Sequence, residues 1–304
     1  MIKSITVTNH TGDSIKVELT RPEFSGFAIT NIEGLGPVKA DINMTDISTY
    51  DGGLYNSSRL GIRNIVFNII FINYYGESIE DIRHRAYTFF QTKTKVKLLF
   101  ETSNHNLETE GYVESNEPAI FSKQEGCTIS ILCPFPYMYS TKEDNRVTFS
   151  NIEPLFEFPF SNESLTESLL EMGSIKIVSE KVITYKGDAE TGIKITIHAY
   201  GEVDNITIYN TETRESMKIN TNLLQELTGS GIIANDEIII NTEKGNKYIR
   251  LLREGTYYNI LNCLDKNASW FQLQNGDNIF AYTAETGVEN LRFTIENRVI
   301  YKGV

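Results

Sequence analysis

The second half of the chain constrains the fold most, because it is built from short runs of alternating apolar and polar residues. In residues 193–198, for example, isoleucine alternates with Lys, Thr and His. Gly, Asn and Asp interrupt such runs about every ten residues, as at 187–188, 235–236 and 275–277. A period of two predicts half-buried strands, and regularly spaced turns predict an all-β sandwich.

Nine strands are expected in this half by count and spacing, which is the pattern of a jelly-roll-like sandwich. One segment, Thr256–Leu264, is expected to form a short helix of one or two turns. The expected strands lie near residues 174–186, 193–200, 205–210, 215–220, 236–241, 246–252, 270–274, 278–283 and 290–301.

The first half opens with two strand-like runs, residues 2–9 and 14–20, joined by His10-Thr11-Gly12-Asp13. Gly and Asn near the joint permit a tight turn, so these runs predict a hairpin. The run from Ile62 to Ile72 is rich in Ile, Val and Phe, and it predicts a buried central strand.

One helix is expected in the first half. Ser78 followed by Asp81 has the spacing of a capping box, which satisfies free amides at a helix start. Apolar residues then recur at helical spacing, and they predict a face that packs on the sheet, with Arg83 on the exposed side. The residues of this face are Ile79, Ile82, Ala86, Phe89 and Phe90.

Length and proline distribution predict two domains. A chain of 304 residues is about two domains at roughly 150 residues each. All seven prolines lie before residue 160, and proline favours extended or connecting structure. We therefore expect a boundary near 140–160, with domains at residues 1–150 and 151–304.

Charge and cysteine content argue against a DNA-binding protein and against a disulfide-linked one. The net charge is −12; residues 1–150 hold 14 basic and 18 acidic side chains, and residues 151–304 hold 14 and 22. No basic patch stands out, so non-specific DNA binding is not expected. The three cysteines lack a C-x-x-C spacing, which favours reduced, buried thiols. No signal peptide or membrane span is expected.

No residue pattern points to catalysis. The four histidines have no partner at a spacing typical of metal ligands, and there is no P-loop, G-x-S-x-G or H-E-x-x-H. We expect no enzyme, no cofactor and no metal. Two alternatives stay open: a carbohydrate-binding module using Trp270 as a stacking platform, and a glycosidase with paired glutamates.

Several segments, in their order along the chain, resemble the distal tail proteins of long-tailed phages. In the first half these are YDGGLYNSSRLGIRNIVFNIIF, SIEDIRHRAYTFFQTK and KVKLLF. In the second half they are FEFPFSN, KGDAETG, ITIYNTETRESMKIN, DEIIINTEKGNK, NILNCL, SWFQLQNGDN and the final YKGV. Their number and their order carry the resemblance over nearly the whole chain.

The resemblance implies a mainly β fold. It implies an N-terminal β-sandwich of the tail-tube-like ring type with one packed α-helix, followed by a C-terminal galectin-like jelly-roll sandwich. It further implies a virion structural protein at the tail tip or baseplate, made in the bacterial host cytoplasm. The N-terminal domains would form a hexameric ring, and the expected partners are the tail tube protein, the tail-associated hub protein and receptor-binding proteins. DNA would only pass through the channel.

Five residues are candidates for the subunit interface: Tyr50, Asp51, Tyr55, Arg59 and Arg63. They flank the Gly52-Gly53 turn signal and the polar Asn-Ser-Ser-Arg stretch after it. Tyr and Arg are side chains that often anchor interfaces. The sequence therefore predicts that this hairpin carries contacts between copies.

Overall fold

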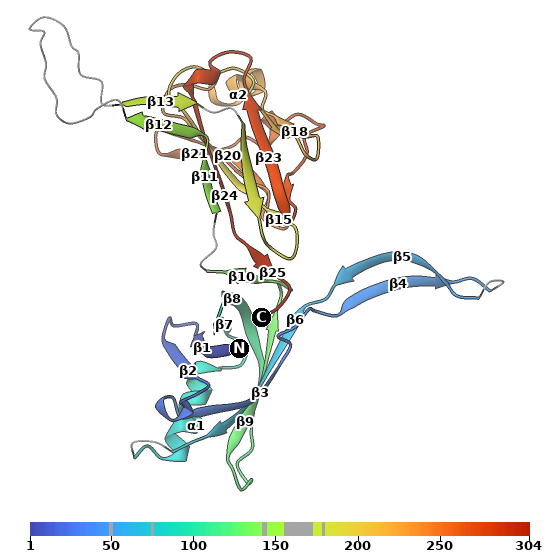
Figure 1. Ribbon diagram of the computed structural model, residues 1–304, viewed down its shortest axis with the longest axis vertical. Coiled ribbons are helices and arrows are strands. Elements are labelled where there is room, and N and C mark those ends of the chain that lie inside the picture. The colour runs from blue at the N-terminus through green and yellow to red at the C-terminus, as the bar shows by residue number, and fades with distance from the viewer. Residues whose placement is uncertain (49–50, 74–75, 142–144, 155–172, 178–179) are drawn as a thin grey trace, which may run out of the picture. The chain divides into compact units, whose positions relative to one another are not determined.

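The computed structural model describes residues 1–48, 51–73, 76–141, 145–154, 173–177 and 180–304 (Figure 1). They divide into two compact units, one of Met1–Glu143 with Ile300–Val304 and one of Asp144–Val299. The expected domains, 1–150 and 151–304, differ from this division at both ends of the second unit. The last five residues return to the first unit because Met138 and Tyr139 pair with Tyr301 and Ile300.

Both units are mainly β, as expected from the sequence. In the first unit, an antiparallel sheet has the order β2-β1-β7-β8-β9-β6-β3, and β10 pairs with both β8 and β25. The bounds are β1 Ile2–Thr8, β2 Ser14–Glu18, β3 Phe27–Glu33, β6 Arg63–Phe71, β7 Lys95–Thr102, β8 Asn106–Pro118, β9 Gly126–Cys133, β10 Met138–Ser140 and β25 Ile300–Tyr301, with a 3-10 turn at Pro22–Phe24.

The expected hairpin at the start of the chain is confirmed. β1 and β2 pair in register from Ser4↔Glu18 to Thr8↔Ser14. In the turn, Asn9 Oδ1 accepts hydrogen bonds from the amides of Thr11 and Asp13 at 3.1 and 2.9 Å. Gly12 has φ +94°, a conformation that costs glycine little because it has no Cβ.

The expected helix is also confirmed, as α1, Ile79–Phe89. Both bonds of the capping box between Ser78 and Asp81 are present. Ile82, Ala86 and Phe90 are buried, whereas Phe89 is only half-buried. Arg83 was expected on the exposed side, and this is wrong: its side chain is 15% exposed and Nη1 lies 2.9 Å from Glu125 Oε2.

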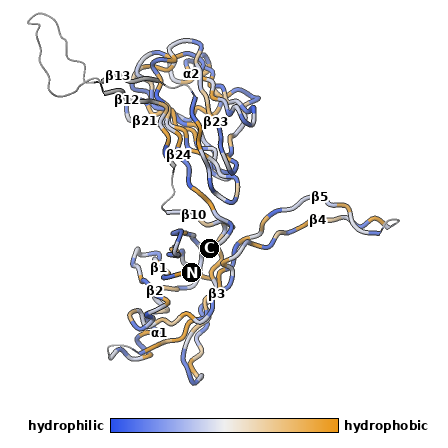
Figure 2. Tube along the Cα trace, viewed as in Figure 1, coloured by the Kyte–Doolittle hydropathy of each residue, from blue (hydrophilic) through white to orange (hydrophobic). Residues whose placement is uncertain are grey.

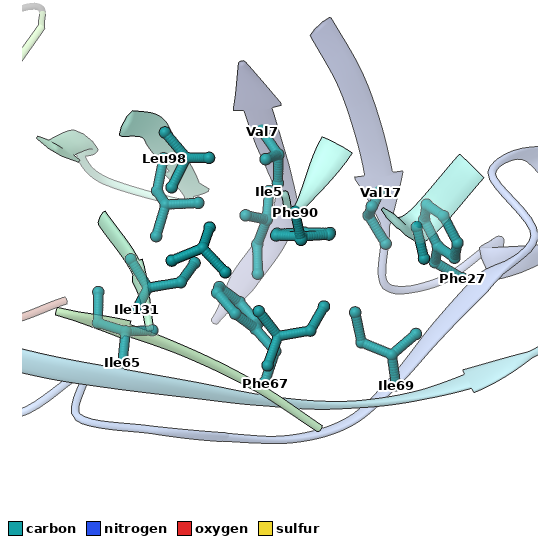
Figure 3. Packing of buried hydrophobic residues seen from close by; sticks show 14 of the residues in the cluster. Ile5, Val7, Val17, Phe27, Ile65, Phe67, Ile69, Phe90, Leu98 and Ile131 are labelled. Atoms are coloured by element: carbon teal, nitrogen blue, oxygen red, sulfur yellow. The ribbon is translucent and has the colours of Figure 1, made fainter. Parts of the chain in front are cut away.

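The core of the first unit lies between strands from opposite parts of its sheet (Figure 3). Ile5 and Val7 of β1 and Val17 of β2 face Ile65, Phe67 and Ile69 of β6, with Phe90 from the end of α1 between them. β6 alternates between buried and less buried residues along its whole length. It is therefore a strand with one core face, and Ile62, placed in it by the sequence analysis, is 57% exposed.

The second unit is a sandwich of two antiparallel sheets, β11-β24-β16-β19-β20-β21 and β14-β23-β17-β18. Tyr282 of β23 stacks on Phe293 of β24 with ring centroids 3.8 Å apart, so the two sheets pack face to face. The bounds are β11 Asn145–Thr148, β14 Glu180–Tyr185, β16 Lys194–Ala199, β17 Thr207–Asn210, β18 Glu215–Lys218, β19 Glu237–Asn241, β20 Tyr248–Arg253, β21 Thr256–Asn259, β23 Gly276–Thr283 and β24 Leu291–Asn297.

Two small ribbons accompany the sandwich: β12 (Ser150–Pro154) with β13 (Gly173–Ile177), and β15 (Thr191–Gly192) with β22 (Gln272–Leu273). The motif FEFPFSN and most of the 161–174 segment lie outside the described residues. The sandwich architecture is as expected; its galectin-like character stays an expectation.

One expected element in this unit is wrong. Residues 256–264, expected to be helical, form β21 and then a 3-10 turn at Leu261–Cys263. The cause is the preceding turn: Glu254 and Gly255 both have positive φ, the geometry of a tight hairpin. This turn pairs Thr256 with Arg253.

A helix that the sequence analysis missed, α2 (Thr221–Thr228), lies elsewhere in the unit. Asn220 caps its start, with Oδ1 accepting from the amides of Asn222 and Leu223. Gly229 ends it in the left-handed conformation, at φ +85°.

Candidate interface arm

A two-stranded ribbon extends from the first unit, formed by β4 (Ala40–Asp46) and β5 (Gly53–Leu60) (Figure 1). These strands pair only with each other. We call β4, β5 and the described residues between them the arm. Of its strand residues, Ala40 is half-buried and all the others are exposed. Apart from its base, therefore, the arm has almost no contact with the body of its own unit.

One face of the arm is apolar. Residues that pair directly across two strands point to the same side, and the pairs Ala40↔Leu60 and Met44↔Tyr55 share a face with Ile42. Ile42, Met44 and Tyr55 are 57%, 58% and 58% exposed. Figure 2 shows hydrophobic stretches along this otherwise solvent-surrounded ribbon. We call Ala40, Ile42, Met44, Tyr55 and Leu60 the apolar face.

The opposite face is largely polar. The pairs Asp41↔Arg59 and Asn43↔Ser57 lie on it, and Arg59 Nε is 3.4 Å from Asp41 Oδ2. The register shifts after Asn43, so that Asn56 is an extra residue in β5. Asn56 donates from its side chain to Thr45 Oγ1 at 2.6 Å. The bulge thus keeps Tyr55 on the apolar face and turns Asn56 to the polar one.

The structure places three of the five predicted interface residues on the arm. Asp51 is exposed at its tip, Tyr55 lies on the apolar face, and Arg59 lies on the polar face with 84% of its side chain exposed. Tyr50 lies outside the described residues. Arg63 is not on the arm but at the start of β6, and it is 1% exposed, so its expected place in the hairpin is corrected.

Arg63 instead ties the base of the arm to the rest of the unit. Its Nη1 donates to the carbonyls of Gly34 and Gly36, which lead into β4. Its Nε and Nη2 both donate to Pro136 O, at 3.0 and 2.7 Å, and Nη2 also donates to Lys302 O at 2.6 Å. All five N–H groups of the guanidinium are therefore used.

Within the described residues, no carboxylate forms an ion pair with Arg63. Burial lowers the pKa of the Arg63 guanidinium below its ordinary value, because desolvation disfavours the charged form. The same burial raises the pKa of the Cys133 thiol, and the nearby Arg63 charge partly opposes this shift. Four carbonyl oxygens, rather than a carboxylate, stabilise the charge of Arg63. Because these carbonyls belong to three separate segments of the chain, Arg63 holds the three segments together.

A cavity of about 810 Å³ lies beside this junction, at the base of the arm. The backbone there is closely packed: a Cβ on Gly34 would come within 1.8 Å of Asn64 O, so this position requires glycine. The lining residues are Gly34, Gly36, Pro37, Val38, Lys39, Asp41, Arg59, Leu60, Gly61, Ile62, Arg63, Asn64, Pro134 and Pro136.

The described residues can be compared with the kinds of site that the sequence left open. No group of three or more His, Cys, Asp or Glu side chains among them is placed to hold a metal ion. No helix in the described part of the chain has the length and hydropathy needed to cross a bilayer. Trp270, the candidate sugar platform, is half-buried, and Lys247 Nζ lies 5.2 Å from its ring centroid. Its own chain thus occupies a ring face that a sugar would use.

The sequence contained a signal for the apolar face that the analysis did not use. In ADINMTD, Ala40, Ile42 and Met44 alternate with Asp, Asn and Thr, which is the pattern of a strand with one buried face. The structure leaves that face open, and an exposed apolar strand face is typical of an interaction surface.

Comparison with a known protein family bears on the second unit. Residues 186–298 match the family model described as siphovirus-type tail component, C-terminal domain. Residues 186–298 therefore form a domain of this family. The resemblance to phage distal tail proteins is thereby confirmed. This family is a structural one, which is consistent with the expectation that the chain is not an enzyme.

Solved structures of phage tail proteins align with this chain over nearly its whole length. The crystal structure of the SPP1 Dit (gp 19.1) protein, described as a paradigm of the hub adsorption apparatus in phages infecting Gram-positive bacteria, aligns with TM-score 0.64 and 12% identity, covering 97% of this chain and 98% of that one. The phage P2 baseplate in its activated conformation with Ca aligns with TM-score 0.46 and 13% identity, covering 98% of each. No curated protein sequence matches. The SPP1 comparison shows that the two proteins share a fold.

Proposed function

We propose that this tail component forms a hexameric ring at the tail tip, which joins the tail tube to the tail hub and to receptor-binding proteins. The observation that carries the proposal is the arm, an exposed ribbon with an apolar face. The match of residues 186–298 to a tail component domain and the fold shared with the SPP1 hub protein support it. In this role the protein is structural and needs no catalytic residues.

The arm has the physical properties of an assembly element. Solvent-exposed apolar surface is unfavourable, at about 25 cal/mol per Å², and a two-stranded ribbon is marginally stable alone. Ile42, Met44 and Tyr55 are each more than half exposed, so burial against a second copy would stabilise both the arm and the contact. A contact between different surfaces of identical chains closes into a ring when its rotation allows.

The other partners follow from the same role. The second unit is proposed to contact the receptor-binding components, and the first unit the tube and the hub. DNA would pass through the ring without being bound, in keeping with the net charge of −12. The buried, free cysteines suit folding in the reducing cytoplasm of the host before incorporation into the virion.

The mass of the assembly tests this proposal. The parent chain should sediment at about six times 34.5 kDa at high protein concentration. The double variant Ile42→Ser with Met44→Ser should remain at the single-chain mass, because it removes apolar side chains that a partner would bury. The control, Asn43→Ser with Thr45→Ser, changes the polar face of the same strand and should assemble like the parent.

Stability is measured in parallel. Since both sets of residues are exposed, neither double variant should shift the unfolding transition by more than about 0.5 kcal/mol. A parent chain that stays at the single-chain mass at every concentration would contradict the proposal. So would an apolar-face variant that assembles as readily as the polar-face control.

A further inference from the structure

We propose that the cavity at the base of the arm receives the tip of the arm of a second copy. The inference rests on the proposed self-association and names the two surfaces that meet. The tip comprises the described residues Asp46, Ile47, Asp51 and Leu54. The cavity is the one of about 810 Å³ beside Arg63.

The cavity offers a mixed apolar and basic surface. Leu60 and Ile62 on its wall are 38% and 57% exposed. Lys39 and Arg59, also on its wall, are both exposed, with Asp41 as the single acidic residue of the lining. The guanidinium of Arg63 adds a third positive charge at the wall, and its carbonyl contacts fix the backbone around the cavity.

The tip is complementary in both respects. Ile47 and Leu54 are 42% and 56% exposed, and Asp46 and Asp51 are exposed carboxylates. Two apolar side chains and two carboxylates thus face solvent at one end of the arm. Apolar side chains flanked by positive charge face solvent at the other end. Complementary charge of this kind selects a partner and its orientation.

The tip cannot reach the cavity of its own chain while the arm is extended. β4 spans seven residues, and a strand rises about 3.3 Å per residue, so roughly 23 Å separate tip from base. The contact therefore joins two copies through different surfaces. A tip-to-base contact can repeat from copy to copy, which is the requirement for a closed ring.

Charge reversal in the full chain tests the pairing. Asp46→Lys with Asp51→Lys should raise the concentration needed for assembly at least about tenfold, because two like charges then meet the basic cavity. Lys39→Glu with Arg59→Glu should do the same from the other side. All four substitutions in one chain should restore assembly to within about threefold of the parent. Assembly of either double variant at the parent's concentration, or no restoration in the quadruple variant, would overturn the inference.

Cross-linking identifies the contact directly. A chain with Asp51→Cys is mixed with a differently tagged chain that carries Lys39→Cys; the native cysteines are buried. Mild oxidation should join the two chains, since a disulfide forms only where the two Cα atoms lie within about 7 Å. His84→Cys on α1, in place of Lys39→Cys, is the control and should not cross-link. If the parent assembles but the Asp51→Cys and Lys39→Cys chains do not cross-link, this inference alone is contradicted. If the parent does not assemble, the proposed ring is contradicted.

Discussion

Arg63 is the side chain whose loss should most disturb the first unit. Its guanidinium satisfies carbonyls from the base of the arm, from Pro136 and from Lys302. We predict that Arg63→Ala lowers the free energy of unfolding by about 3 kcal/mol or more, because buried acceptors lose their donors. Arg59→Ala, at an exposed ion pair, should change it by no more than about 0.5 kcal/mol. Denaturant titrations of the full chain measure both, and equal small effects would contradict the role given to Arg63.

The three cysteines provide a second test at the level of residues. Burial raises the pKa of the Cys127 thiol to about 12 and raises the pKa values of the Cys133 and Cys263 thiols. We predict that none reacts with a thiol reagent at pH 8 in the folded protein and that all three react in denaturant. Above about pH 9 the unfolded thiols ionise while the folded ones stay protonated, so this contribution to stability falls as pH rises. Rapid labelling of the native chain would contradict the burial.

The structural role of a residue was predictable from the sequence where its partners lie close to it along the chain. Ser78 and Asp81 form the expected capping box because both partners lie within one turn. Arg63 was not predictable, because its partners at Gly34, Pro136 and Lys302 are far away in the sequence. Next to a Gly-rich turn its charge suggested an exposed interface, whereas the fold encloses it.

At the scale of elements, we expect the packing of α1 on the sheet to contribute strongly to the stability of the first unit. Phe90, the residue directly after the helix, is 2% exposed, and its ring centroid lies 6.4 Å from that of Phe67. Truncation of a buried Phe typically costs about 3–5 kcal/mol, so Phe90→Ala should lower the melting temperature clearly. His84→Ala, at a side chain that is 66% exposed, should have almost no effect. Similar melting temperatures for both variants would mean that α1 does not cover the core.

Helices and strands were predictable where the apolar residues repeat with a clear period. They were not predictable where the geometry of a turn determines whether the next segment is a strand or a helix. The alternation at residues 193–198 led to β16, as expected. Residues 256–264 contain apolar spacing that fits a helix, yet Glu254 and Gly255 fold the chain back and produce β21. α2 had its own signals, Asn220 as N-cap and Gly229 as C-terminal stop, and the sequence analysis did not use them.

At the scale of the whole molecule, the end of the chain belongs to the first unit. β25 pairs with β10, Lys302 accepts from Arg63, and the amide of Val304 donates to Leu35 O at 3.0 Å. We predict that removal of residues 300–304 destabilises the first unit and leaves the second unchanged. Trp270, the single tryptophan, lies in the second unit, so its fluorescence transition should not move. Circular dichroism should show an earlier transition for the first unit.

The opposite pattern, an earlier tryptophan transition with no other change, would contradict this assignment of the end of the chain. The sequence analysis placed residues 151–304 in one domain because proline content changes near 150. Composition reveals a boundary between stretches, but it carries no signal for a five-residue segment that returns to pair with a distant strand.

The central claim is that the arm joins copies of this chain into a closed ring. Electron microscopy of the purified full chain at high concentration tests it most directly. We predict rings of six subunits with a central opening, and separate single particles for the chain with Ile42→Ser and Met44→Ser. Open filaments or single particles for the parent, or unchanged rings for the arm variant, would contradict the claim.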